Sequence, residues 1–165
     1  MDSLTIFLTQ LIMSIGVYAL LAKWVVSPWL KTKAVPVVLM ILIAPHAMRH
    51  IGLTFLVPSV TDPAIPAGFA FTTAWGDFAS AVLAIVCLFA LKNSWRLALP
   101  LVWLFNIVGT VDLITALSQA EAVPMLAGTW YIPTFIVPLL LVTHYLIFVR
   151  LFKLFQISNE STLIK

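Results

Sequence analysis

Five long apolar runs constrain the fold of this chain more than any other feature of its sequence. Each run reaches the ~20 residues that an α-helix needs to cross the hydrocarbon core of a bilayer. Within lipid, backbone polar groups must be satisfied inside the segment, so we expect helices rather than open strands. The sequence therefore predicts an all-α, polytopic integral membrane bundle that forms a single domain over residues 1–165. Its five transmembrane helices are expected at about residues 4–26, 35–57, 67–91, 97–118 and 130–154.

The composition agrees with a membrane protein and disfavours other classes. The chain is 62% hydrophobic and 9% charged, whereas soluble domains are about 45–50% apolar and about 25% charged. The net charge is +3, but the basic residues stand at helix ends rather than in a stripe, so nucleic acid is not an expected partner. Cys87 is the single cysteine, which excludes an intramolecular disulfide and a cysteine metal cluster. No basic region precedes the first apolar run, so we expect it to remain as a helix.

The charges of the connecting loops predict an orientation. Basic residues occupy the first and third connections and the C-terminal end, whereas the second and fourth connections carry only Asp62 and Glu121. Basic loops stay in the cytoplasm. We therefore expect a bacterial inner (cytoplasmic) membrane protein with its N-terminus outside and its C-terminus in the cytoplasm. The basic residues are Lys31, Lys33, Lys92, Arg96, Arg150 and Lys153.

The second apolar run contains a polar stretch, Pro45 to Thr54, which carries His46, Arg49 and His50. An arginine near the centre of a membrane helix costs roughly 2.5–3.5 kcal/mol on insertion scales. An ion pair or a wet cavity inside the bundle must offset that cost. On an α-helix the three residues are spaced i, i+3 and i+4 and would share one face.

Other predicted helices bring polar groups to the same depth as this stretch. At 1.5 Å per residue, Asp77, Asn106, Asp112 and His144 fall between the centre and the outer half of the bilayer. Small residues on the same helix face as Asp77 favour close packing, which would point Asp77 into the bundle. One arginine can neutralise only one of the two aspartates. The other must be protonated, pair with a charged histidine or bind a cation.

These groups favour a small membrane transport or binding protein with a titratable polar pocket open to the outer leaflet. Its expected partners are membrane lipid and a small amphipathic molecule, an ion or protons, and a small-residue helix face would also suit a homo-oligomer. The sequence identifies no cofactor. The expected ligand-binding or proton-relay residues, with an aromatic pair at the pocket mouth, are His46, Arg49, His50, Asp77, Asn106, Asp112, Trp130, Tyr131 and His144.

Three alternatives remain open at the level of sequence. One is a membrane-embedded zinc hydrolase, because histidines at i and i+4 can share a zinc ion. Its ligands would be His46, His50, His144 and Asp77, but Ala47 stands where the zincin pattern has its glutamate, so Asp77 would have to act as the base. Another is a b-type haem protein with His46 and His144 as axial ligands. The last is a structural or assembly subunit.

Overall fold

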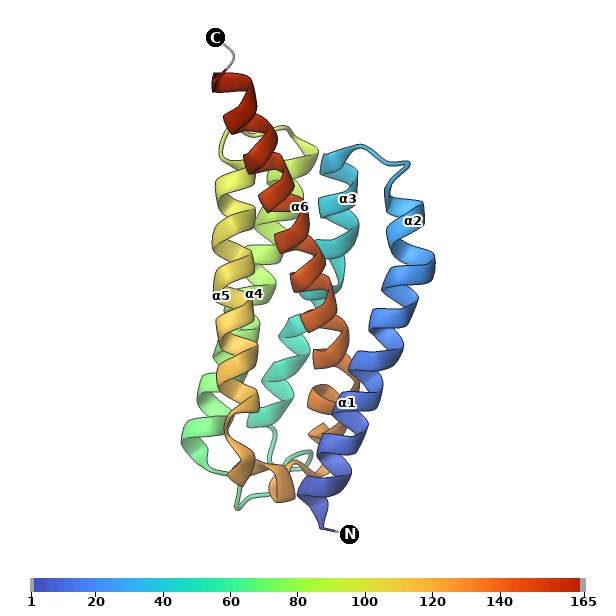
Figure 1. Cartoon of the computed structure of the whole chain (residues 1–165). Helices are drawn as coiled ribbons and strands as arrows, with labels where there is room; N and C mark the ends of the chain where they lie inside the picture. Colours follow the sequence, from blue (N-terminus) through green and yellow to red (C-terminus); the bar gives the residue numbers. More distant parts are fainter. Residues whose placement is uncertain (1, 164–165) are drawn as a thin grey trace.

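The computed structural model describes the backbone of residues 2–163 and the side chains of residues 2–156. Within this part every regular element is helical, and five segments are long and apolar enough to cross a membrane. The predicted all-α fold with five long apolar helices is therefore confirmed. They run up and down in one bundle, with the two termini at opposite ends (Figure 1). In chain order the five long segments are Ser3–Leu30, Val35–Leu56, Ala67–Lys92, Ala98–Leu117 and Ala127–Gln156.

The first long segment continues past a proline at which the predicted helix stops. Pro28 has no backbone N–H, so the α-helical hydrogen-bond ladder cannot run through it unchanged. The chain widens to one π-helical turn just before it, and the Ser27 N–H donates to the Ala22 carbonyl, five residues back. The three parts of the segment are α1 (Ser3–Leu21), the π-helical η1 (Ala22–Val26) and α2 (Ser27–Leu30).

The second long segment changes helix type in its middle. An α-helix, α3 (Val35–Ile43), passes into a 3-10 helix, η2 (Ala44–Leu56), next to Pro45. A 3-10 helix has three residues per turn and rarely exceeds three or four residues, whereas η2 has 13. Residues three apart therefore share a face. The buried residues of η2 are His46, Arg49, Gly52 and Phe55.

The rest of the chain forms α4, α5 and α6, with short irregular turns before α6. A π-helical turn, η5, ends two residues before Pro138, as η1 ends two residues before Pro28. The elements are α4 (Ala67–Lys92), α5 (Ala98–Leu117), the 3-10 turns η3 (Ala120–Met125) and η4 (Ala127–Trp130), η5 (Ile132–Ile136) and α6 (Val137–Leu163).

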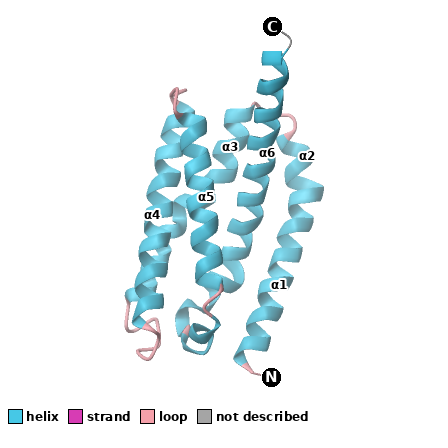
Figure 2. Cartoon of the chain, turned by 60° about the vertical axis from the view of Figure 1, so that its left-hand side comes forward, coloured by secondary structure: helices cyan, strands magenta, loops and turns pink. Residues whose placement is uncertain are grey.

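α1 lies at the edge of the bundle, whereas η2, α4, α5 and α6 pack closely together. η2 lies along α4, α4 contacts α5, and α6 contacts α1, α3 and α5. Figures 1 and 2 both show α1 at one side of the bundle. The small-residue face of α4 points inward, as its pattern predicted. Its buried residues include Ala70, Thr73, Ala74, Asp77, Ser80, Ala81 and Ala84.

Two apolar clusters fill the two ends of the bundle and leave a polar layer between them. The cluster towards the C-terminal end of the molecule includes Leu39, Ile43, Phe105 and Ile147. The cluster towards the N-terminal end includes Phe7, Phe55, Phe69, Val123 and Leu126. The polar residues predicted from the sequence lie mainly in the layer between these clusters.

Candidate functional site

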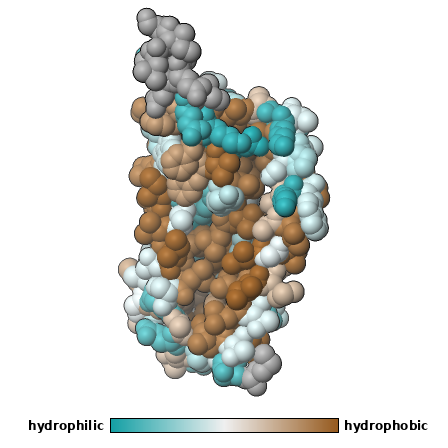
Figure 3. Space-filling model, viewed as in Figure 1, coloured by the Kyte–Doolittle hydropathy of each residue, from teal (hydrophilic) through white to brown (hydrophobic). Residues whose placement is uncertain are grey.

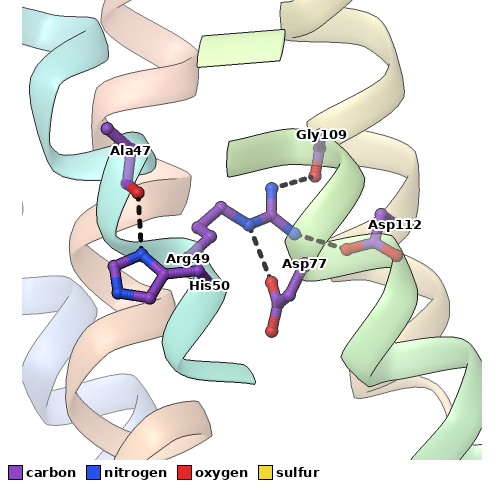
Figure 4. Close-up of polar contacts among 6 residues, drawn as sticks. All are labelled: Ala47, Arg49, His50, Asp77, Gly109 and Asp112. Atoms are coloured by element: carbon purple, nitrogen blue, oxygen red, sulfur yellow. Dashed lines mark hydrogen bonds and ion pairs between the residues drawn. The ribbon is translucent and has the colours of Figure 1, made fainter. Parts of the chain in front are cut away.

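The guanidinium of Arg49 is the centre of the polar layer. Its Nε donates to Oδ1 of Asp77 at 2.7 Å, and its Nη1 donates to the Gly109 carbonyl at 3.2 Å. Its Nη2 pairs with Oδ2 of Asp112. Figure 4 shows the guanidinium reaching from η2 to these three acceptors on α4 and α5. One guanidinium therefore contacts both aspartates, and its single charge can still neutralise only one of them.

Two glycines allow these carboxylates to lie so close to neighbouring helices. A Cβ atom at Gly52 of η2 would lie 2.6 Å from the Cβ of Asp77 on α4. A Cβ atom at Gly76 of α4 would lie 2.7 Å from the Cγ of Asp112 on α5. Both separations are shorter than any ordinary contact between carbon atoms. The glycines therefore set the helix spacing that lets Arg49 reach both aspartates.

His144 of α6 is held by Asn106 of α5. The Asn106 Nδ2 donates to the backbone carbonyl of His144 at 3.2 Å, so its Oδ1 is left to accept. That oxygen lies 2.6 Å from Nδ1 of His144, which therefore carries the proton in the neutral ring. The other ring nitrogen, Nε2, has no hydrogen-bond partner in the described part of the chain. It faces Gly109, where a Cβ atom would lie 2.8 Å from Nε2 and 3.0 Å from Nη1 of Arg49.

His46 of η2 packs directly against His144. Their ring centroids are 4.1 Å apart, and Phe105 packs on both rings at 5.1 and 5.3 Å. Nε2 of His46 lies 2.9 Å from the hydroxyl of Thr143, which donates its own proton to carbonyls one turn earlier in α6. Nε2 is therefore the protonated nitrogen. Nδ1 of His46 also has no partner among the described residues, so each of the two packed rings has one buried nitrogen without a hydrogen bond.

A narrow pocket with a cavity volume of about 30 Å³ lies between the N-terminal end of the molecule and the two aspartates. Asp77 and Asp112 are the charged residues among those that line it, and the remaining walls are mostly apolar. Oδ2 of Asp77 and Oδ1 of Asp112 make no hydrogen bond within residues 2–156. The apolar lining includes Phe7, Phe55, Phe69, Leu113, Val123, Leu126, Ile132 and Val137.

His50 lies outside this site, although the sequence placed it on the same face as His46 and Arg49. Its ring is exposed, and Nδ1 lies 3.1 Å from the Ala47 carbonyl. Figure 4 shows it on the opposite side of η2 from the Arg49 side chain. The prediction is wrong because it assumed an α-helix. With three residues per turn, a spacing of four turns the side chain about 120° away.

We expected Trp130 and Tyr131 at the mouth of the pocket, but neither residue lines it. Nε1 of Trp130 donates to Oε1 of Gln10 at 2.7 Å, and its ring packs against Phe7 at 5.8 Å. Tyr131 is 72% exposed. Trp130 is the last residue of the 3-10 turn η4 and its side chain contacts α1, whereas Tyr131 follows the turn and faces the outside of the bundle. Trp130 therefore fixes α1 to η4, at the start of the fifth long segment.

The geometry disfavours the two cofactor hypotheses. With His50 turned away, the set of His46, His50, His144 and Asp77 is not assembled. No group of three or more histidine, cysteine or acidic side chains within the described residues is placed to hold a metal ion. The rings of His46 and His144 touch, so a haem macrocycle cannot lie between them. Within the described residues, the groups of the polar layer contact one another through ion pairs and hydrogen bonds.

Sequence reasoning missed Gly52 and Gly76 as parts of the site, and it missed Thr143 as the partner of His46. One signal for Gly52 was present in the sequence. His46, Arg49, Gly52 and Phe55 recur every three residues after Pro45, a period that fits a 3-10 helix. The roles of Gly76 and Thr143 depend on which helices are neighbours, so no local pattern marks them.

Comparison with known proteins places the chain in a family. A family model described as "Domain of unknown function (DUF8737)" matches residues 6–152. The chain belongs to this family. The matched range contains every residue of the polar layer. No curated protein and no solved structure matches the chain. The family description states no activity, so function has to be argued from the site.

Proposed function

We propose that the chain is an integral membrane protein that binds a small amphipathic cation and carries it across the bilayer in exchange for protons. Its five long apolar helices support insertion. The face in Figure 3 is apolar across its middle and more hydrophilic towards its ends, as a lipid-exposed surface requires. In the proposed orientation the N-terminus and the pocket opening are outside. The basic loops and the C-terminus are then in the cytoplasm of a bacterial inner membrane.

One observation carries this proposal: a pocket with apolar walls ends on two carboxylates that share a single guanidinium. With neutral histidines, Arg49, Asp77 and Asp112 leave one negative charge in excess. An uncompensated charge is expensive in a low-dielectric interior. A cation or a proton at the free carboxylate oxygens relieves that excess, whereas an anion increases it. The apolar walls suit the body of an amphipathic molecule.

Competition between cation and proton for the same negative charge is the proposed basis of exchange. When the cation leaves, a proton can occupy a carboxylate or one of the two unused imidazole nitrogens, Nε2 of His144 and Nδ1 of His46. The hydroxyl of Thr143 is hydrogen-bonded to His46 and extends this polar chain along α6. The site faces the N-terminal end, and the apolar cluster around Leu39 and Ile43 closes the other end.

A binding series on the detergent-purified protein tests the charge preference. Isothermal titration calorimetry would compare butyltrimethylammonium, 1-hexanol and hexanoate, which are cationic, neutral and anionic molecules of similar size. We expect the cation to bind best. Asp77→Asn/Asp112→Asn should weaken its binding about tenfold or more, since each tenfold step is about 1.4 kcal/mol. Glu121→Gln, which removes an exposed carboxylate in the connection before α6, should leave it unchanged.

Transport is tested in proteoliposomes with radiolabelled butyltrimethylammonium. A pH gradient with an acidic interior should drive uptake by wild-type protein, and a protonophore should abolish it. The Asp77→Asn/Asp112→Asn variant should show no gradient-driven uptake. Uptake that is the same in this double variant and in the wild type would overturn the proposal, as would stronger binding of hexanoate than of the cation.

A further inference from the structure

A second hollow, separate from the central pocket, runs between the first long segment and α6. It has a volume of about 650 Å³ and opens on the outside of the bundle. Figure 1 shows α1 and α2 diverging from α6 towards the end of the molecule where the C-terminus lies. We call this hollow the α1–α6 groove. Its lining residues are Ile15, Ala19, Ala22, Lys23, Ser27, Lys31, Leu141, Val142, Tyr145 and Leu146.

The π-helical turn η1 aligns one row of this lining. Ile15, Ala19, Lys23, Ser27 and Lys31 follow one another at intervals of four residues. In a regular α-helix, Lys31, sixteen residues after Ile15, would be rotated roughly 160° from Ile15 about the helix axis. A π-helical turn accommodates one extra residue, and this reduces the rotation by about 100°. The groove therefore has apolar side chains along one part and two lysines with a hydroxyl along the other.

Neither lysine of the groove has a counter-charge among the side chains of residues 2–156. The side chains of Lys23 and Lys31 are exposed, and neither forms an ion pair with another described residue. Lys23 stands inside the apolar run, ~12 Å along the helix from Lys31. Trp24 and Trp29 beside them are 66% and 50% exposed, as residues at a membrane interface are. A lysine at that depth extends its ammonium group towards the lipid phosphates.

We propose that the α1–α6 groove binds an anionic glycerophospholipid of the cytoplasmic leaflet. Its phosphate lies between Lys23 and Lys31, with the Ser27 hydroxyl as a further donor, and one acyl chain follows Ile15 and Ala19 towards the membrane centre. Basic pockets between helices on the cytoplasmic side hold such headgroups. A zwitterionic lipid brings a positive group to the same lysines and binds less well. This inference rests on the proposed insertion into the membrane, but not on the proposed cation site.

Native mass spectrometry of the detergent-purified protein tests this assignment. Phosphatidylglycerol and phosphatidylcholine with the same acyl chains would be added in parallel, with glycerol phosphate as a probe for the phosphate alone. We expect retained phosphatidylglycerol to exceed phosphatidylcholine by about tenfold, and no retained glycerol phosphate. Lys23→Gln/Lys31→Gln should abolish the preference. The matched control, Lys33→Gln/Lys92→Gln, removes the same charge outside the groove and should retain it.

Ala19→Phe adds an independent arm, because it fills the apolar part of the groove without changing any charge. It should reduce retention of both lipids, and melting curves without added lipid would show that the bundle is intact. Equal retention of phosphatidylglycerol by the groove and control variants would overturn the assignment. A dimer that the groove variant lacks would also overturn it, since a second copy of the chain would then occupy the groove. The Lys23→Gln/Lys31→Gln variant should lose the lipid preference and still bind butyltrimethylammonium as the wild type does. This result separates the test of the groove from the test of the central site.

Discussion

At the residue scale, Arg49 connects three helical elements, because it lies on η2 and binds acceptors on α4 and α5. It contacts Asp77 on α4, and Asp112 and the Gly109 carbonyl on α5. The planar guanidinium presents several donors in fixed directions, so one side chain can serve two carboxylates. A lysine at this position would offer a single charged point. The identity of Arg49 therefore determines both the geometry and the charge excess of the site.

Removing the positive charge should destabilise the protein far more than removing one of the negative charges. Arg49→Gln leaves the buried carboxylate of Asp77 and the partly buried carboxylate of Asp112 without a cation, and it should lower the unfolding free energy by roughly 3–5 kcal/mol. Asp112→Asn leaves one positive and one negative charge, so it should lower the unfolding free energy by no more than about 1 kcal/mol. Thermal unfolding in detergent, followed by tryptophan fluorescence, measures both. Asp112→Asn as destabilising as Arg49→Gln would contradict the charge excess inferred here.

At the element scale, the change from α3 to η2 decides which side chains enter the polar layer. η2 presents His46, Arg49 and Gly52 along one face because it has three residues per turn, and the same geometry excludes His50. A mid-helix 3-10 stretch often marks a hinge or a sequence under strain. Since η2 carries Arg49 and His46, a change in this element would move both groups of the site together.

The close approach of α4 and α5 gives a second prediction. A Cβ at Gly76 would overlap the Asp112 carboxylate, so Gly76→Ala must displace it from Arg49. We expect a loss of about 1–3 kcal/mol in unfolding free energy, as for other overpacked sites. The control is Gly16→Ala in α1, where nothing lies within 4 Å. It should stabilise the helix by about 0.5–1 kcal/mol. Equal effects in thermal unfolding would show that Gly76 does not set the helix spacing.

At the scale of the whole molecule, the two ends of the bundle differ in charge and in access to the site. The connections between α2 and α3 and between α4 and α5 lie at the same end as the C-terminus (Figure 1) and carry Lys31, Lys33, Lys92 and Arg96. The pocket that reaches Asp77 and Asp112 lies towards the other end. The proposed orientation therefore follows from loop charge, and it puts the pocket opening outside.

Cysteine labelling checks this orientation. In a Cys87→Ala background, which removes the single buried thiol, Ser59→Cys and Thr32→Cys each place one exposed thiol in a loop at opposite ends. A membrane-impermeant maleimide should label Ser59→Cys in intact cells and Thr32→Cys only after lysis. The reverse pattern would show that the C-terminal end is outside and that the pocket faces the cytoplasm.

The sequence by itself determined the five long helices and the residue types of the polar layer. Helix length and apolar content are local properties of a chain, so Arg49, Asp77, Asp112, Asn106 and the buried histidines could be proposed from depth alone. Only the tertiary structure decided how these groups pair. Pairing depends on the 3-10 geometry after Pro45 and on which helices approach closely at glycines, and these depend on packing between distant segments. That is why His50 and the aromatic pair were misplaced and the shared guanidinium was not foreseen.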